Sequence, residues 1–348
     1  MDAKTIPSDD ENLNLFDRSS DEIHSQITQE LRTSLTPIQA ALTLLEKGIV
    51  TAESESGKHL LKLALGNTNR LLRMIQIIES EHIFNYTTLL ADSNNNIEIE
   101  KDLNLALARQ ELKLFYQPII CLKSGKIKSF EALVRWQHPT KGMLSPDKFI
   151  SVAENSGLIH DLGIYVFEQA CQQLQNWQQQ FKTEPSLQLS INLSGLQLIH
   201  PDLSHIFGKI FTKSGLSPGS LNLEITESAL TQEDWLTLSN IKALKQLGIE
   251  FSVDDFGTGY SSLSRLEDFP INTLKIDRSF VQLKRWQLVK AILLIASSLN
   301  LNVIIEGIET FEELESLRAI GGRVFQGYFF SEPIDGLTAT HLIQSSLL

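Results

Sequence analysis

Apolar residues in the first hundred positions follow the period of an α-helix. They recur in steps of three and four residues, so one face of a helix would carry them as a single stripe. The first run comprises Ile23, Ile27, Leu31, Leu35, Ile38, Leu42 and Leu45. After a polar break, the second run comprises Leu61, Leu65, Leu72 and Ile75. The pattern predicts an all-α helical hairpin over residues 21–84, preceded by a flexible acidic N-terminus at residues 1–20.

A lone hairpin of this kind leaves one apolar stripe uncovered. The simplest cover is a second copy of the hairpin, which would complete a four-helix bundle. The sequence therefore predicts a homodimer formed through this segment. Residues 85–102 are polar and rich in asparagine, which indicates a linker.

From residue 103 to residue 348, short apolar segments alternate with amphipathic helical patterns. Units of this size are typical of the strand and helix pairs of a (β/α) barrel. The expected strands are LKLFYQPI (112–119), KSFEALVRW (128–136), LQLSINLS (187–194), LNLEITES (221–228), EFSVDDFG (250–257), NTLKID (272–277), NVIIEGIE (302–309) and RVFQGYFF (323–330). This part is predicted to be an α/β domain with a TIM-like barrel.

Each expected strand contains a polar residue near its end, within an otherwise apolar segment. Because catalytic residues of such barrels gather at the C-terminal ends of the strands, we expect these side chains to share one rim. They are Gln117, Glu131, Asn192, Glu224, Asp254, Lys275, Glu306 and Gln326.

Charge and composition narrow the classes of function. The 348 residues carry a formal net charge of -12, which argues against a general nucleic-acid-binding surface, since such surfaces need many lysines and arginines. The acidic start lacks the features of a signal peptide, and no run reaches the roughly 18 apolar residues of a membrane span. The sequence predicts a cytoplasmic protein without membrane insertion.

The polar strand-end residues predict a metal site. Each alone is typical of a solvated strand end or a turn, but one oxygen-lined site beside an ammonium accounts for all of them. Carboxylates and an amide, without histidine or cysteine, favour Mg²⁺ or Mn²⁺ over Zn²⁺. So many carboxylates, with Asp254 able to bridge, suit two ions. Glycines at 257 and 259 would let the loop after Asp255 turn the carboxylates toward them.

Seven segments, in this order, resemble the signature of EAL-domain cyclic di-GMP phosphodiesterases. They are EALVRW, SINLS, LEITES, DDFGTGYSSL, LKIDRSFV, IIEGIET and QGYFFSEP, and the resemblance covers residues 103–345. It implies a TIM-like barrel of the EAL type with one antiparallel strand, two Mg²⁺ or Mn²⁺ ions, and hydrolysis of cyclic di-GMP to linear pGpG in second-messenger signalling. It also implies the barrel surface as a second possible contact of the homodimer. The chain departs from the common pattern at Ile305, where a small residue is usual, and at Glu332, where a lysine is usual.

The resemblance also implies a role for each matching residue. Those similar to metal ligands are Glu131, Asn192, Glu224, Asp254, Asp255 and Glu306. Those implied in catalysis are Glu131, Asp255, Lys275 and Glu306, with Lys275 holding the attacking water. Those similar to contacts of the dinucleotide are Gln117, Leu133, Arg135, Asp277 and Glu309. Glu227 resembles the residue that fixes the loop of Gly257 and Gly259.

The helical hairpin resembles the dimerisation and phosphoacceptor (HisKA) domain of histidine kinases. The similar segments are TQELRTSLTPIQAALTLL and HLLKLALGNTNRLLRMI. Gln29 stands at that family's histidine position and Ser34 at its proline position. Because an amide cannot form a phosphoramidate, the resemblance implies a dimerisation module, or a docking surface for a response regulator or histidine kinase.

Two alternatives to an active enzyme remain open at this point. One is a catalytically weak or silent cyclic di-GMP receptor, which would have lost a metal ligand or Lys275. The other is a docking protein of a two-component system. Every polar residue that hydrolysis requires is present in the sequence, which favours the enzyme.

Overall fold

A computed structural model describes residues 31, 35–54, 56–58, 60–61, 64–68, 71, 98–181, 186–230, 235–258, 266 and 268–346. The chain divides into two compact units. The smaller comprises Met1–Lys101 with Ser151–Gly157, and the larger comprises Asp102–Ile150 with Leu158–Leu348.

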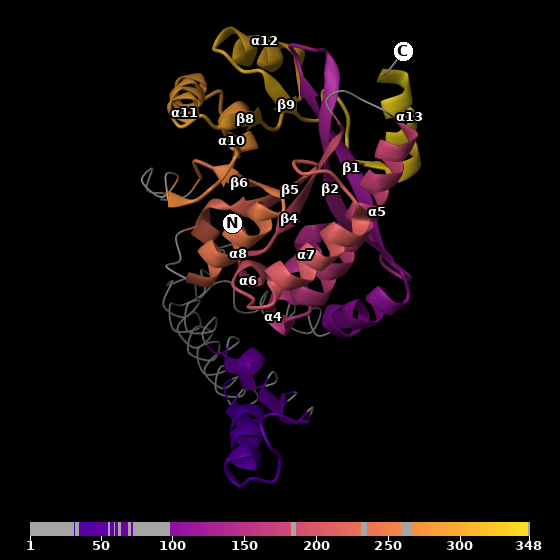
Figure 1. Ribbon diagram of the computed structural model, residues 1–348, viewed down its shortest axis with the longest axis vertical. Helices are drawn as coiled ribbons and strands as arrows, with labels where there is room; N and C mark the ends of the chain where they lie inside the picture. Colours follow the sequence, from indigo (N-terminus) through magenta and orange to yellow (C-terminus); the bar gives the residue numbers. More distant parts are fainter. Residues whose placement is uncertain are drawn as a thin grey trace, which may run out of the picture. The chain divides into compact units, whose positions relative to one another are not determined.

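Helices are present in the smaller unit where the hairpin was predicted. Residues 35–46 are helical, residues 47–54 form a turn, and the described residues between 56 and 71 are helical again (Figure 1). The acidic N-terminus, the positions of Gln29 and Ser34, and residues 85–97 of the linker lie outside the described residues. The HisKA resemblance and the proposed boundaries stay predictions.

The larger unit is a closed barrel of mostly parallel strands (Figure 1). Its strands are β1 (Leu112–Cys121), β2 (Lys126–His138), β3 (Gly142–Leu144), β4 (Gln188–Leu193), β5 (Leu221–Thr226), β6 (Glu250–Phe256), β7 (Thr273–Ile276), β8 (Asn302–Ile305), β9 (Val324–Gln326) and β10 (Ile334–Asp335). In the described part of the chain, the ring runs β1-β2-β4-β5-β6-β7-β8-β9 and closes because β1 pairs with both β2 and β9. The predicted TIM-like barrel is confirmed.

Strand β1 is antiparallel to both of its ring neighbours. The other neighbouring pairs of the ring, from β2–β4 to β8–β9, are parallel. The one antiparallel strand of the ring that the EAL-domain resemblance implied is therefore present. Two short strands were not predicted: β3 pairs with β2, and β10 pairs with β1, both in antiparallel orientation.

Helices alternate with the strands along the chain, and those of the larger unit cover the barrel from outside (Figure 1). They are η2 (Pro146–Lys148), α5 (Ile159–Gln180), α6 (Gly195–Leu198), α7 (Leu203–Ser214), η3 (Glu227–Leu230), α8 (Trp235–Gln246), α10 (Arg278–Gln282), α11 (Trp286–Ser298), α12 (Phe311–Ala319) and α13 (Gly336–Ser346). Helix α4 (Ile150–Ser156) belongs almost entirely to the smaller unit. Buried aromatic side chains fill the space between helices and strands, among them Phe130, Phe167, Trp177 and Phe251. No helix in this described portion is long and apolar enough to cross a bilayer.

Polar caps fix the points at which the chain leaves the barrel strands. Ser194 caps α6 directly after β4, and Thr310 caps α12 after β8, each in a reciprocal capping box. Asp277 caps α10 directly after β7, where its carboxylate accepts a hydrogen bond from the Ser279 amide at 3.0 Å. These caps set the turns that follow the strand ends.

The barrel interior carries a polar layer beneath its rim. Side chains two positions apart on a strand share a face, so this layer lies one step below the strand-end residues. Its members are Ser129, Ser190, Asn222, Ser252 and Thr273. The Asn222 amide donates to Ser190 Oγ at 3.0 Å and to Ser252 Oγ at 2.7 Å, which ties β4, β5 and β6 together. Bulky branched residues are usual at such positions of a TIM barrel.

Candidate functional site

The strand pairing brings the predicted polar residues to the same end of the barrel interior. Gln117 of β1 lies opposite Glu131 of β2. Asn192 of β4 lies opposite Glu224 of β5. Because the strands are parallel and the pleat has a period of two, residues Asp254 of β6 and Lys275 of β7 point to the same interior.

Lys275 lies at the centre of this group, with its side chain only 1% exposed. Its Nζ atom contacts one oxygen from each of four carboxylates on four different strands or strand ends. The distances are 3.3 Å to Glu131 Oε2, 2.5 Å to Glu224 Oε2, 3.1 Å to Asp254 Oδ1 and 2.6 Å to Glu306 Oε1. A lysine is almost never fully buried unless it is paired, and here the pairing is fourfold.

The shared environment shifts the pKa values of Lys275 and of the carboxyl groups around it away from their usual values. Burial alone lowers the pKa of Lys275, but the carboxylates of Asp254, Glu131, Glu224 and Glu306 outweigh it and hold that pKa well above its usual value. Burial raises the pKa of Glu306 to about 8, opposed by Lys275 and supported by the charges of Asp254 and Glu131. Burial also raises the pKa of Glu224 well above its usual value.

Glu131 differs from the other carboxylates because three donors reach it. Burial raises its pKa, but Lys275 and the hydrogen bonds from Gln326 and Asn192 lower it by more, so its pKa lies below the usual value. The Asn192 amide donates to Glu131 Oε1 at 2.7 Å. Unlike Glu224 and Glu306, Glu131 is therefore stabilised as an anion.

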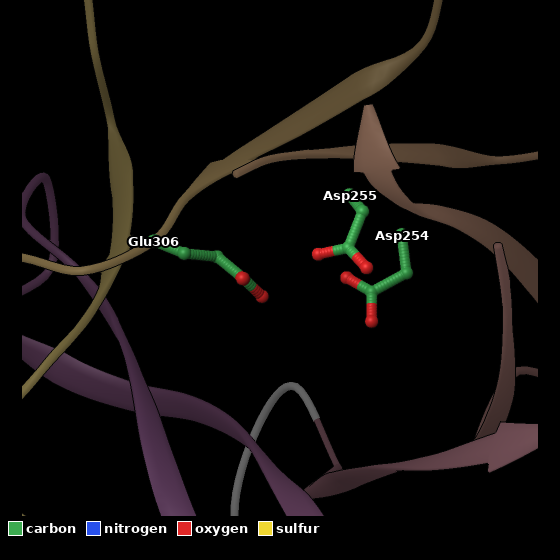
Figure 2. A group of neighbouring side chains, drawn as sticks. All are labelled: Asp254, Asp255 and Glu306. Atoms are coloured by element: carbon green, nitrogen blue, oxygen red, sulfur yellow. The ribbon is translucent and has the colours of Figure 1, made fainter. Parts of the chain in front are cut away.

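Three carboxylates converge at the end of β6 and β8. One oxygen from each of Asp254, Asp255 and Glu306 lies within 4.8 Å of the others, and Figure 2 shows the groups pointing toward one another. On a regular strand, adjacent side chains point to opposite faces. The backbone of Asp255 has φ of 54°, and the pairing of β6 with β7 is irregular between Val253 and Phe256. This break in the strand lets two consecutive aspartates face one site.

The donor set fits a hard divalent cation. Its groups are carboxylates and one amide, which are the oxygen ligands of Mg²⁺ and Mn²⁺. Glu224 Oε1 is buried and accepts no hydrogen bond from the described residues, so it is free to bind an ion. The acidic cluster can therefore hold a metal, whereas the identity and number of the ions stay predictions.

The predicted link between Glu227 and the glycine loop is a direct hydrogen bond. The Gly257 amide donates to Glu227 Oε2 at 2.8 Å. Gly257 has φ of 96°, and a Cβ atom there would lie 2.7 Å from Phe280 Cζ, so a side chain does not fit. Gly259 lies outside the described residues.

The residues predicted to contact substrate are less tightly grouped. Leu133 and Arg135 are half-buried on β2, beyond Glu131 toward the C-terminal end of the strand. The Asp277 carboxylate is engaged as the cap of α10. Glu309 is exposed after β8. Only Gln117 is linked by hydrogen bonds to the central carboxylates.

That link is Gln326, for which the sequence analysis predicted a place at a strand end and no further role. Its Nε2 donates to Gln117 Oε1 at 2.9 Å and to Glu131 Oε2 at 2.7 Å. Gln117 Nε2 in turn donates to the Ser331 carbonyl at 3.1 Å. A lone amide in the apolar segment around Gln326 was the available signal. No sequence signal indicated the contact with Ser331, because its acceptor is a backbone carbonyl and every residue carries one.

Comparisons with known proteins agree with this architecture. The family model described as EAL domain matches residues 100–333. NbdA of Pseudomonas aeruginosa, named a cyclic di-GMP phosphodiesterase, is 37% identical over 251 residues, covering 71% of this chain and 32% of NbdA. MucR of the same organism, named a bifunctional diguanylate cyclase/cyclic di-GMP phosphodiesterase, is 34% identical over 258 residues, covering 73% of this chain and 37% of MucR.

Solved structures show the same fold. The PaMucR phosphodiesterase in complex with c-di-GMP has a TM-score of 0.66 and 34% identity, covering 70% of this chain and 99% of that one. The EAL enzyme Bd1971 in its cAMP- and cyclic-di-GMP-bound form has a TM-score of 0.70 and 32% identity, covering 79% of this chain and 76% of that one. The matched region spans 30% to 37% of the length of several curated relatives, including one from Caulobacter vibrioides.

Proposed function

Because the chain belongs to the EAL-domain family, we propose that it is a metal-dependent phosphodiesterase that hydrolyses cyclic di-GMP to linear pGpG. The observation that carries the proposal is the contact of Lys275 with four carboxylates at the barrel rim. The names of NbdA and MucR, and the c-di-GMP bound in the MucR structure, support the choice of substrate.

The carboxylates divide between two ion positions in this proposal. Glu131, Asn192, Glu224 and Asp254 hold the first Mg²⁺ or Mn²⁺. Asp254, Asp255 and Glu306 hold the second, which the convergence of their oxygens supports. When bound, the ions lower the pKa of water and neutralise charge on the phosphodiester.

Other residues hold the reactants around these ions. Lys275 positions the attacking water by donating a hydrogen bond to it, since its ammonium is buried among the ligands. The guanidinium of Arg135 binds a phosphate oxygen or a base edge of the dinucleotide. The substrate is contacted by Gln117, Leu133, Asp277 and Glu309 as well. Glu227 keeps the loop after Asp255 in place through the Gly257 amide.

Turnover by the purified chain tests the proposal. Cyclic di-GMP is incubated with protein and Mg²⁺ or Mn²⁺, and pGpG is measured by anion-exchange chromatography, with a chelator as the blank. Asp254→Asn should abolish product formation, whereas Glu250→Gln, at the other end of the same strand, should keep it. Tight binding of cyclic di-GMP without pGpG under either metal would establish the silent receptor instead.

For the hairpin, we propose a second copy of the chain as its cover. Leucines of the described helices are exposed in the single chain, with fractions of 43% for Leu35, 52% for Leu42, 41% for Leu61 and 63% for Leu65. A response regulator or histidine kinase would be the alternative occupant. Sedimentation should show a dimer that Leu42→Asp with Leu65→Asp dissociates, whereas Leu337→Asp on the exposed face of α13 leaves it intact.

A further inference from the structure

Gln326 makes two donor contacts from the same nitrogen. The residue ends β9, is 4% exposed, and lies between Gln117 of β1 and Glu131 of β2. Both of its acceptors are oxygens, and a carboxylate anion can only accept, so the NH₂ group must face them. Gln326 Oε1 is left buried and accepts no hydrogen bond from the described residues. The acceptor on Glu131 therefore dictates the orientation of this amide.

Glu131 is held by donors from three different strands. Asn192 of β4 reaches Oε1, and Lys275 of β7 together with Gln326 of β9 reaches Oε2. Asn192 and Lys275 have further roles in the proposed mechanism. Gln326 is neutral and contacts Glu131 from the side of β1 and β9, so it restrains the rotation of the carboxylate about its last bond.

The same amide also orients Gln117. Because Gln117 Oε1 accepts from Gln326, its own Nε2 points the other way and donates to the Ser331 carbonyl. Ser331 belongs to the segment between β9 and β10. A continuous chain of hydrogen bonds thus runs from Glu131 through Gln326 and Gln117 to that segment.

We propose that Gln326 is the positioning residue of Glu131, which it holds in the orientation that binds the divalent cation while fixing Gln117 on the substrate side. The proposal rests on the proposed function for its activity readout, but its metal-binding readout needs no substrate. Groups that orient a metal ligand typically change metal affinity or activity 10- to 100-fold when they are removed.

The test replaces the amide with a side chain of similar length that cannot donate. Gln326→Met should weaken Mn²⁺ binding, measured by calorimetry without nucleotide, by about 10- to 100-fold and lower kcat by a similar factor. The matched control is Gln188→Met, which removes a half-buried glutamine donor at the opposite end of β4 and should leave both values unchanged. Thermal unfolding of each variant checks that the barrel is intact.

A double-mutant cycle separates positioning from a general loss of structure. In a Glu131→Gln background, Gln326→Met should cause no further loss of Mn²⁺ affinity, because both changes act on one group. Unchanged Mn²⁺ affinity in folded Gln326→Met, or full additivity with Glu131→Gln, overturns the proposal. If Gln326→Met does not fold, a crystal structure of the wild-type chain with Mn²⁺ decides: a Gln326 amide turned away from Glu131 overturns the proposal, and the contact supports it.

These outcomes are distinct from failure of the proposed function. A wild-type chain that binds Mn²⁺ but releases no pGpG would remove the phosphodiesterase assignment. The double-mutant cycle would still test whether the Mn²⁺ affinity depends on Gln326.

Discussion

Replacing Lys275 with methionine tests whether one ammonium holds the carboxylates of the barrel rim together. Methionine keeps an unbranched apolar side chain of similar length but removes the charge. The Lys275 side chain is 1% exposed, and Nζ lies within 3.3 Å of oxygens from four acidic residues. The substitution leaves the four acidic groups without the ammonium, and it leaves the anionic Glu131 carboxylate without its charged partner.

The expected loss of stability is large. Removing one partner of a buried ion pair costs about 3–5 kcal/mol, because the charge left behind stays out of water. In a domain of this size each kcal/mol lowers the unfolding midpoint by about 2–4 °C. Metal-free Lys275→Met should therefore unfold about 6–20 °C below the wild-type chain. Lys209→Met, at an exposed position on α7, is the control and should shift the midpoint by less than about 2 °C.

Circular dichroism melts in a chelator and in excess Mg²⁺ make the comparison. Divalent cations supply the charge that the variant lacks, so the gap between the variant and the wild-type chain should narrow in Mg²⁺. A gap below about 4 °C in chelator would refute the reasoning, since it would mean that the carboxylates do not depend on the ammonium. A gap that does not change with Mg²⁺ would argue against a cation at this position.

Three further predictions concern the metal and its loop. Because Glu306 has a pKa of about 8, a proton must leave it when an ion binds. The Mg²⁺ affinity measured by calorimetry should therefore rise with pH up to about 8 and then level off. An affinity that does not change between pH 6 and 8 would contradict this. Gly257→Ala should lower turnover more than Gly125→Ala, because both positions have positive φ but only Gly257 has an atom 2.7 Å from the added Cβ; equal effects would remove the role of Phe280. Ca²⁺ should inhibit Mg²⁺-dependent turnover, since it prefers more ligands at longer distances, and Ca²⁺-supported hydrolysis at the Mg²⁺ rate would count against a compact site.

The strands were predictable because each is a short apolar run with one polar residue. Each of the eight expected segments of the ring overlaps an observed strand, and the polar residues of β2, β5 and β6 gather around Lys275 of β7 at one end of the barrel interior. The short strands β3 and β10 contain no such run. They form by pairing with β2 and β1, which the local sequence does not indicate. Local pattern therefore indicated the ring but not its extensions.

The site was predictable in its members and less so in its geometry. Asp254 and Asp255 are adjacent in sequence, but only the positive φ of Asp255 explains how both face one site. The amide of Gln326 looked like one more strand-end residue, because its two acceptors come from strands more than 190 residues away. Contacts of that range leave no local pattern in a single sequence.

The antiparallel direction of β1 determines at which end of the barrel the preceding chain is attached. Leu112 at the start of β1 pairs with Trp136 near the C-terminal end of β2, so the chain joins the barrel on the same side as the acidic rim. In a fully parallel barrel the first strand would begin at the opposite end, far from the ligands. Here, four residues of β1 separate that entry point from Gln117, and Gln326 links Gln117 to Glu131 by hydrogen bonds. A displacement of the chain before Leu112 would therefore be transmitted along β1 to Gln117 and the proposed metal ligand Glu131. It would not have to pass through the hydrophobic core.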